Sequence, residues 1–154
     1  MKKLVLSIVV ALSFASVANA QTDSVKLAGS VQLERVQVVD GVEKVTLAEP
    51  SVVVPGDRLL FTTRFENTGT VKADNVVVTN PLPGAVALAA DSAPSLSVSV
   101  DDGKSFGPLA SLAVADGKGG TRPAQAADVT HVRWVLVTVA PGANGTLTYR
   151  AIVR

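Results

Sequence analysis

The sequence predicts an all-β protein, built as one antiparallel β-sandwich of about seven to nine strands. Three observations lead to this prediction. Apolar residues alternate with polar ones in several short segments, glycine- and proline-containing turns separate those segments, and no segment after residue 20 shows the periodicity of a helix. Alternation is typical of a half-buried strand, because successive side chains point to opposite faces of a sheet.

The clearest pattern lies between residues 55 and 84. Within residues 58–66, apolar side chains and Thr63 occupy every second position, and most of the positions between them are charged or polar. A turn at residues 67–69 is followed by a second strand around residues 76–78. Pairing is expected to stop at Pro81 and Pro83, because proline cannot donate a hydrogen bond to a strand ladder.

These turns and strands together resemble the bacterial "conserved repeat domain", known as domain of unknown function eleven, an immunoglobulin-like module of exported and cell-surface proteins. The resemblance covers roughly residues 30 to 154. It rests on the strand at residues 75–79 and on the turn residues Pro55, Gly56, Asp57, Asn67, Gly69, Leu82 and Pro83. It implies an Ig-like sandwich with no assigned activity. Asn80 stands where members usually carry an acidic residue, and Pro81 where they carry a small polar one, so no metal role is carried over to that turn.

The first twenty residues have the pattern of a secretory signal peptide. Lys2 and Lys3 precede the apolar run 4–17, and Ala18-Asn19-Ala20 provides a small-residue cleavage site. The run is shorter than the roughly 20 residues that a membrane-spanning helix needs. The predicted organisation is therefore a signal peptide at 1–20, a flexible segment at 21–29 and an Ig-like sandwich domain at 30–154. We expect cleavage after Ala20 and export to the periplasm or the cell surface.

The composition of residues 21–154, which follow the predicted signal peptide, excludes some classes of chemistry. This part of the chain contains no cysteine, which excludes disulfides and thiolate catalysis. Without Lys2 and Lys3, 12 of the 14 basic residues remain against 13 acidic ones, so the formal charge is about −1. This near-neutral balance gives no electrostatic basis for binding nucleic acid. We expect a protein or an envelope component as the partner.

The first strand segment contains a conflict of parity. Val31 and Leu33 occupy odd positions, whereas Val36 and Val38 occupy even ones, so residues 30–39 are not expected to form one regular strand with one buried face. A β-bulge or a switch between sheets would resolve the conflict. Asp40-Gly41 is a turn signal, and residues 42–47 would then form a short edge piece.

A second motif lies between residues 99 and 106. Leu96, Val98 and Val100 alternate with serines, and the segment that follows is similar to the Asp-box turn of sialidase propellers. The residues that match the motif are Ser99, Asp101, Gly103 and Phe106. The expected role is structural, with the aspartate accepting hydrogen bonds from turn amides. Glycan or calcium binding is the alternative for this single copy.

The last third of the chain is expected to form a long loop and the last two strands. Residues 107–128 would form a long irregular connection, where a binding function could lie. The most apolar strand follows at 129–139, and the Asn144-Gly145 turn should direct the last strand, 147–153, back along it. The residues expected at the centre of the core are Phe61, Phe65, Val132, Trp134 and Leu136.

No catalytic, cofactor-binding or metal-binding residue is predicted. His131 is the only histidine, and Asp101, Asp102, Asp116 and Asp128 occupy turn or loop positions where aspartate caps the backbone. The expected function is that of a non-catalytic structural or adhesion-type interaction module. The alternatives are a fibre subunit that exchanges terminal strands and a glycan-binding accessory domain.

Overall fold

The computed structural model describes residues 24–154, so the predicted signal peptide and its cleavage site lie outside the described residues. Ten strands occur in this part of the chain: β1 (Val25–Val39), β2 (Val42–Ala48), β3 (Arg58–Asn67), β4 (Ala73–Pro81), β5 (Val86–Leu88), β6 (Ser97–Ser99), β7 (Ala113–Ala115), β8 (Thr121–Pro123), β9 (His131–Val139) and β10 (Asn144–Val153). Three single-turn 3₁₀ helices lie at Ala93–Ser95, Leu109–Ser111 and Ala126–Asp128. Residues 24–154 contain no helix long and apolar enough to cross a membrane.

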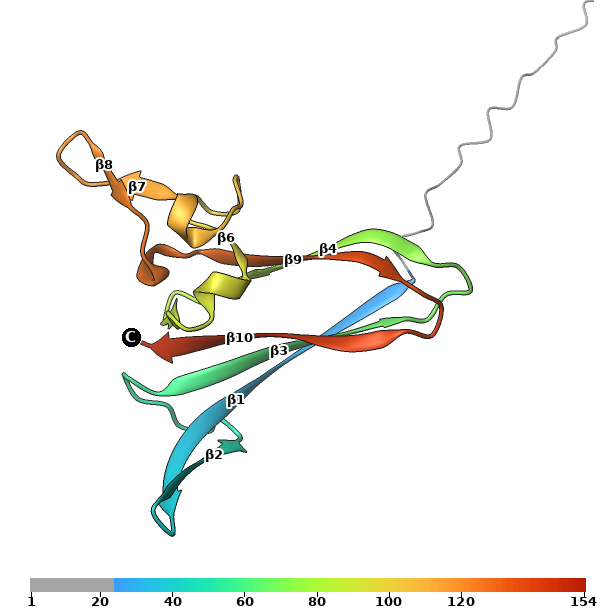
Figure 1. Cartoon of the computed structure of the whole chain (residues 1–154), viewed down its shortest axis with the longest axis horizontal. Helices are drawn as coiled ribbons and strands as arrows, with labels where there is room; N and C mark the ends of the chain where they lie inside the picture. Colours follow the sequence, from blue (N-terminus) through green and yellow to red (C-terminus); the bar gives the residue numbers. More distant parts are fainter. Residues whose placement is uncertain (1–23) are drawn as a thin grey trace, which may run out of the picture.

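The strands form an antiparallel β-sandwich, as predicted (Figure 1). One sheet has five strands in the order β2-β1-β3-β10-β5, and the other has three in the order β4-β9-β6. The eight strands of the sandwich fall within the predicted range. The remaining pair, β7 and β8, forms a small separate hairpin, so the segment 107–128 is not the irregular connection that we expected.

The parity conflict in the first strand has a different solution from the predicted bulge or switch between sheets. β1 is one continuous strand, and its register with β3 and with β2 runs without interruption. It also begins at Val25, inside the segment 21–29 that was expected to be flexible, because residues 25–29 pair with β3. Residues 35–39 extend beyond the start of β3 and pair only with β2. Because the strand is regular, Val36 and Val38 point to the face opposite to Leu33, where they are 56% and 69% exposed.

Two connections whose sequences resemble hairpin turns join strands that belong to different sheets. β3 belongs to the five-stranded sheet, whereas β4, which follows it, belongs to the three-stranded sheet. β10 was expected to pair with β9, but its partners are β3 and β5. The turn between β9 and β10 uses Gly142 at a φ of 73°, and Asn144 and Gly145 are already the first residues of β10. The interpretation of Asn144-Gly145 as the turn was therefore wrong.

The core lies between the two sheets, with Tyr149 at its centre. Tyr149 stacks on Phe61, with ring centroids 4.7 Å apart, and its ring lies 6.1 Å from that of Trp134. The fully or almost fully buried residues around these rings include Leu33, Leu59, Val98, Val132 and Ala151. Phe65 and Leu136 are only half-buried and lie outside this cluster. Phe65 lies across Gly145, where a Cβ atom would approach its Cζ to 2.7 Å.

Candidate functional site

The Asp-box-like turn satisfies its own polar groups. The Asp101 carboxylate accepts hydrogen bonds from the Ser105 hydroxyl at 2.6 Å, from the Ser105 amide at 2.9 Å and from the Ser99 hydroxyl at 2.7 Å. The Ser105 hydroxyl is the main reason that the pKa of Asp101 lies well below its usual range. Gly103, at a φ of 82°, donates its amide to Ser99 Oγ. The carboxylate oxygens are thus used within the loop, which supports a structural role.

Phe106, the last residue of that motif, connects the loop to β9. The Arg133 guanidinium lies over the Phe106 ring, 3.4 Å from its centroid, and the His131 ring meets Phe106 edge-on at 6.5 Å. A cation above an aromatic face is attracted by the ring quadrupole. This contact fastens the loop to the outer face of the three-stranded sheet.

The other acidic residues are separate from one another. Asp116 Oδ1 accepts the amides of Lys118 and Gly120, so the glycine-rich loop binds its own carboxylate and is not arranged around a phosphate. Asp128 forms a two-bond ion pair with Arg122, each bond 2.7 Å long. Within residues 24–154, no three histidine or acidic side chains come together as metal ligands would.

Asp128 should make stability depend on pH. The Arg122 guanidinium, helped by the Gln125 amide, lowers the pKa of Asp128 from 3.8 to about 2. Because the folded-state pKa is the lower one, the stabilisation is complete above about pH 4 and is lost as the pH falls towards about 2. We expect the difference in Tm between the wild type and Asp128→Asn to close over this window. A difference that stays constant from neutral pH to pH 2 would contradict the assignment.

The turn residues of the family resemblance hold the ends of strands. Asp57 Oδ2 accepts the Val54 amide at 2.9 Å, and Gly56, at a φ of 94°, donates to the carbonyl of Val153. Pro55 is exposed in this turn. Asp57 therefore closes the turn, and the backbone of Gly56 connects it to the end of β10.

Asn67 is the most enclosed residue of this group. It is fully buried, and its Nδ2 donates to the carbonyls of Val71 and Val139, both at 2.9 Å. Its Oδ1 accepts the Gly69 amide at 3.0 Å. Gly69 is packed so closely that an added Cβ would lie 2.6 Å from Ser24 Cβ. Asn67 thus joins the end of β3 to the end of β9 across the two sheets.

Two hollows in the surface of the described residues have well-defined linings. The larger, about 660 Å³, lies over the ends of β1, β3 and β10 and is lined by strand side chains that include Leu27, Arg64 and Phe65. The smaller, about 390 Å³, is lined by Leu82, Pro83, Asp102, His131 and Arg154, among others.

Polar side chains that line the smaller hollow already have hydrogen-bond partners within the protein. The Arg154 guanidinium donates to the carbonyls of Val86 and Ala127, and His131 Nδ1 lies 3.1 Å from Thr130 Oγ1. The two hydrogen bonds of Arg154 hold this residue in the hollow.

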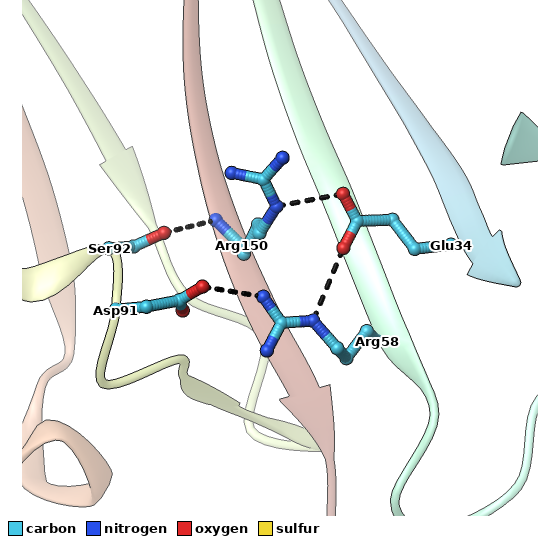
Figure 2. A network of polar contacts seen from close by, with 5 residues as sticks. All are labelled: Glu34, Arg58, Asp91, Ser92 and Arg150. Carbon is cyan, nitrogen blue, oxygen red and sulfur yellow. Dashed lines mark hydrogen bonds and ion pairs between the residues drawn. The ribbon is translucent and has the colours of Figure 1, made fainter. Parts of the chain in front are cut away.

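A charged network covers the outer face of the five-stranded sheet (Figure 2). Glu34 lies between two guanidinium groups, with Oε2 3.2 Å from Arg58 Nε and Oε1 2.7 Å from Arg150 Nε. Arg58 also reaches Asp91 at 2.7 Å, and this contact is the main reason that its pKa is raised. The Glu34 side chain is only 6% exposed, and both of its carboxylate oxygens contact these guanidinium groups. The network joins β1, β3, β10 and the chain after β5.

Glu34→Gln should lower the free energy of unfolding by about 1–2 kcal/mol, because a nearly buried carboxylate is replaced between two arginines that are themselves partly exposed. Asp91→Asn provides the control, since the Asp91 side chain is 57% exposed and should contribute less than about 0.5 kcal/mol. Urea denaturation measures both. Equal losses in the two variants would contradict the assignment.

Exposed apolar residues are concentrated in one stretch of the chain. Between Val36 and Val54, nine large apolar side chains are 39–72% exposed, out of fourteen in the part of the chain that the structure describes. They are Val36, Val38, Val39, Val42, Val45, Leu47, Val52, Val53 and Val54. We call residues 36–54 the apolar arm. The β1–β2 hairpin within it projects away from the rest of the sandwich (Figure 1).

Sequence reasoning missed the apolar arm as a site. The available signal was the change of parity between Leu33 and Val36, which we interpreted as a bulge or a switch between sheets. In the structure the strand stays regular, so Val36 lies on the face opposite to Leu33 and is exposed there.

Comparisons with protein-family models, with curated proteins and with solved structures found no match. The resemblance to the conserved repeat domain therefore stays a prediction. The class of protein that the structure defines is an all-β sandwich with an exposed apolar arm.

Proposed function

We propose that this protein is a non-catalytic, exported structural or adhesion-type interaction module of the bacterial cell envelope, and that it binds a protein partner through the apolar arm. The observation that carries the proposal is the concentration of nine exposed apolar side chains on one arm. Soluble monomers rarely leave a large contiguous apolar patch exposed, and such patches mark interaction sites. The export part of the proposal rests on the signal-peptide pattern of residues 1–20.

The geometry of the polar groups supports a non-catalytic role. Asp101, Asp116 and Asp128 are each bonded to neighbours within their own loop. His131 has one polar contact, with Thr130, and its ring otherwise packs beside Phe106. None of these side chains forms a pair of nucleophile and base.

The two alternatives receive less support. A fibre subunit that donates its C-terminal strand would have to release β10, which is paired along both edges, with β3 and with β5. A glycan-binding role would use the Asp-box-like turn, whose aspartate oxygens are taken up by the turn itself.

Site-directed photocrosslinking in the native envelope tests the proposal. A photoreactive phenylalanine analogue in place of Val38 should yield adducts of discrete mass, because Val38 is 69% exposed on the arm. The same analogue in place of the exposed Ala110, in the 3₁₀ helix Leu109–Ser111 and outside the apolar arm, provides the control. Excess unlabelled protein should compete for the Val38 adducts. Equal yields at the two positions would remove the arm as the binding surface.

A further inference from the structure

The free edges of the two sheets differ in how they are protected. β5 and β6 are edge strands of three residues each. β4 is a long edge strand, but Asn75 within it has a φ of 54°, Asp74 adds a charge and Pro81 ends it. Short length, irregular backbone, charge and proline are the usual devices that prevent edge-to-edge pairing.

β2 carries the charges of Glu43 and Lys44 but lacks the other devices. It has seven residues with no proline and no positive φ, and its register with β1 is continuous. Among the described residues, β2 pairs only with β1. Val42, Val45 and Leu47 are 47–67% exposed. A regular, apolar edge of this kind is a template for another strand.

The hairpin turn determines which backbone groups of β2 face outward. Asp40 and Gly41 have φ values of 54° and 79°, as a two-residue type I′ turn requires. Val39 and Val42 are then the hydrogen-bonded pair that closes the turn, and hydrogen-bonded residues alternate along the ladder. Even-numbered residues of β2 therefore direct their amides and carbonyls to β1. The outward groups belong to Glu43, Val45 and Leu47.

Only a few registers allow two copies of β2 to pair about a two-fold axis. Facing residues must lie on the same side of the joined sheet, and both must present outward backbone groups. The register that uses every outward group places Val45 opposite Val45 of the second copy. Glu43 then faces Leu47 of the second copy, and Leu47 faces Glu43. Each of these pairs can exchange two hydrogen bonds.

The polarity and charge of the facing side chains are compatible with this register. Val36 lies directly opposite Val45 in the β1–β2 ladder, and the two are 56% and 58% exposed. Pairing would therefore create a row of four valines across the axis, Val36 and Val45 from each copy. No like charges face one another, because Lys44 lies opposite Thr46 of the second copy. Residues 35–48 contain two basic and two acidic residues, so two copies carry no net repulsion.

We propose that the protein forms a two-fold symmetric dimer in which β2 pairs antiparallel with β2 of a second copy, centred on Val45. The two five-stranded sheets then become one continuous sheet. The inference rests on the proposed function, since it names a second copy of this chain as the partner of the apolar arm.

A charge-exchange experiment on the purified protein tests both the dimer and its register. Sedimentation velocity should show a dimer that dissociates on dilution. Val45→Lys and Val45→Glu should each be monomeric, because each places two like charges opposite one another. An equimolar mixture of the two variants should restore a dimer that contains one of each. A wild-type protein that stays monomeric up to millimolar concentration would overturn the proposal, as would variants that stay dimeric or a mixture that does not associate.

A proline pair controls for damage to the fold. Val45→Pro removes an outward amide and should abolish the dimer while leaving the thermal midpoint close to that of the wild type. Lys44→Pro removes an amide that bonds to β1 and should disrupt the hairpin itself. A Val45→Pro variant that stays folded and dimeric would contradict the pairing of β2.

The crosslinking experiment separates failure of this dimer from failure of the proposed function. A monomeric protein whose Val38 adduct contains a different protein would leave the apolar arm as an interaction surface and overturn self-pairing. A Val38 adduct of two copies that is lost in Val45→Pro would support self-pairing. Equal adduct yields from Val38 and Ala110 together with a monomeric protein would overturn both.

Discussion

Tyr149→Ala is expected to lower the free energy of unfolding by about 3–5 kcal/mol, enough to unfold a domain of ordinary stability. Tyr149 is 3% exposed and stacks on Phe61 from the neighbouring strand β3. Its ring also reaches Trp134 in the other sheet, so its removal leaves a cavity between the two layers. Urea denaturation followed by the fluorescence of Trp134, the only tryptophan, measures the loss.

Tyr149→Phe is the matched control, because it keeps the stacked ring. Burial raises the pKa of Tyr149 from 10.0 to about 12, so the unfolded chain loses this proton at a lower pH than the folded one. Stability should therefore be complete below about pH 10 and fall as the pH rises towards about 12, and Tyr149→Phe should lack this fall. A loss of less than about 1 kcal/mol in Tyr149→Ala would show that the sheets close over the space.

Asn67→Ala is expected to cost about 3 kcal/mol, because it removes three hydrogen bonds and leaves the buried end of β9 without a donor for the Val139 carbonyl. Asn67→Asp should be at least as damaging at neutral pH. A carboxylate oxygen would then face two carbonyl oxygens at a fully buried position. Urea denaturation of both variants measures these losses.

Asn144→Ala serves as the comparison for Asn67. Asn144 is exposed at the start of β10, and its replacement should change the free energy of unfolding by no more than about 0.5 kcal/mol. If Asn67→Ala and Asn144→Ala cost the same, the hydrogen bonds of Asn67 do not hold the two sheets together.

The strands with one covered face could be predicted from the sequence. Leu59 and Thr63 are buried on β3, and on β9 Val132 is buried while Val135 and Val137 are exposed, as the alternation indicated. These assignments succeed because the two faces of a strand differ in polarity wherever a second layer covers one of them. The polar geometry of the turn at residues 99–106 also follows from the sequence, since its hydrogen bonds join residues within a few positions of one another.

The choice of strand partners could not be predicted in the same way. Backbone hydrogen bonds are alike at every residue. The sequence of the segment 144–153 therefore does not indicate that its neighbours are β3 and β5 rather than β9. Asn144-Gly145 illustrates this limit. This dipeptide is a strong local turn signal, but the turn forms at Gly142, and the strand that follows it belongs to the other sheet.

The sequence by itself determined the all-β class, the covered faces of the longest strands and the turns that hold them, because each depends on the properties of neighbouring residues. The tertiary structure decided which strands pair, where the core is centred and where the cover of the second sheet ends. On the inner face of β1 that cover ends after Leu33, because Arg35, Gln37 and Val39, which have the same parity, are exposed. Val36 lies on the opposite face, and only the presence or absence of a facing layer separates its role from that of Leu33.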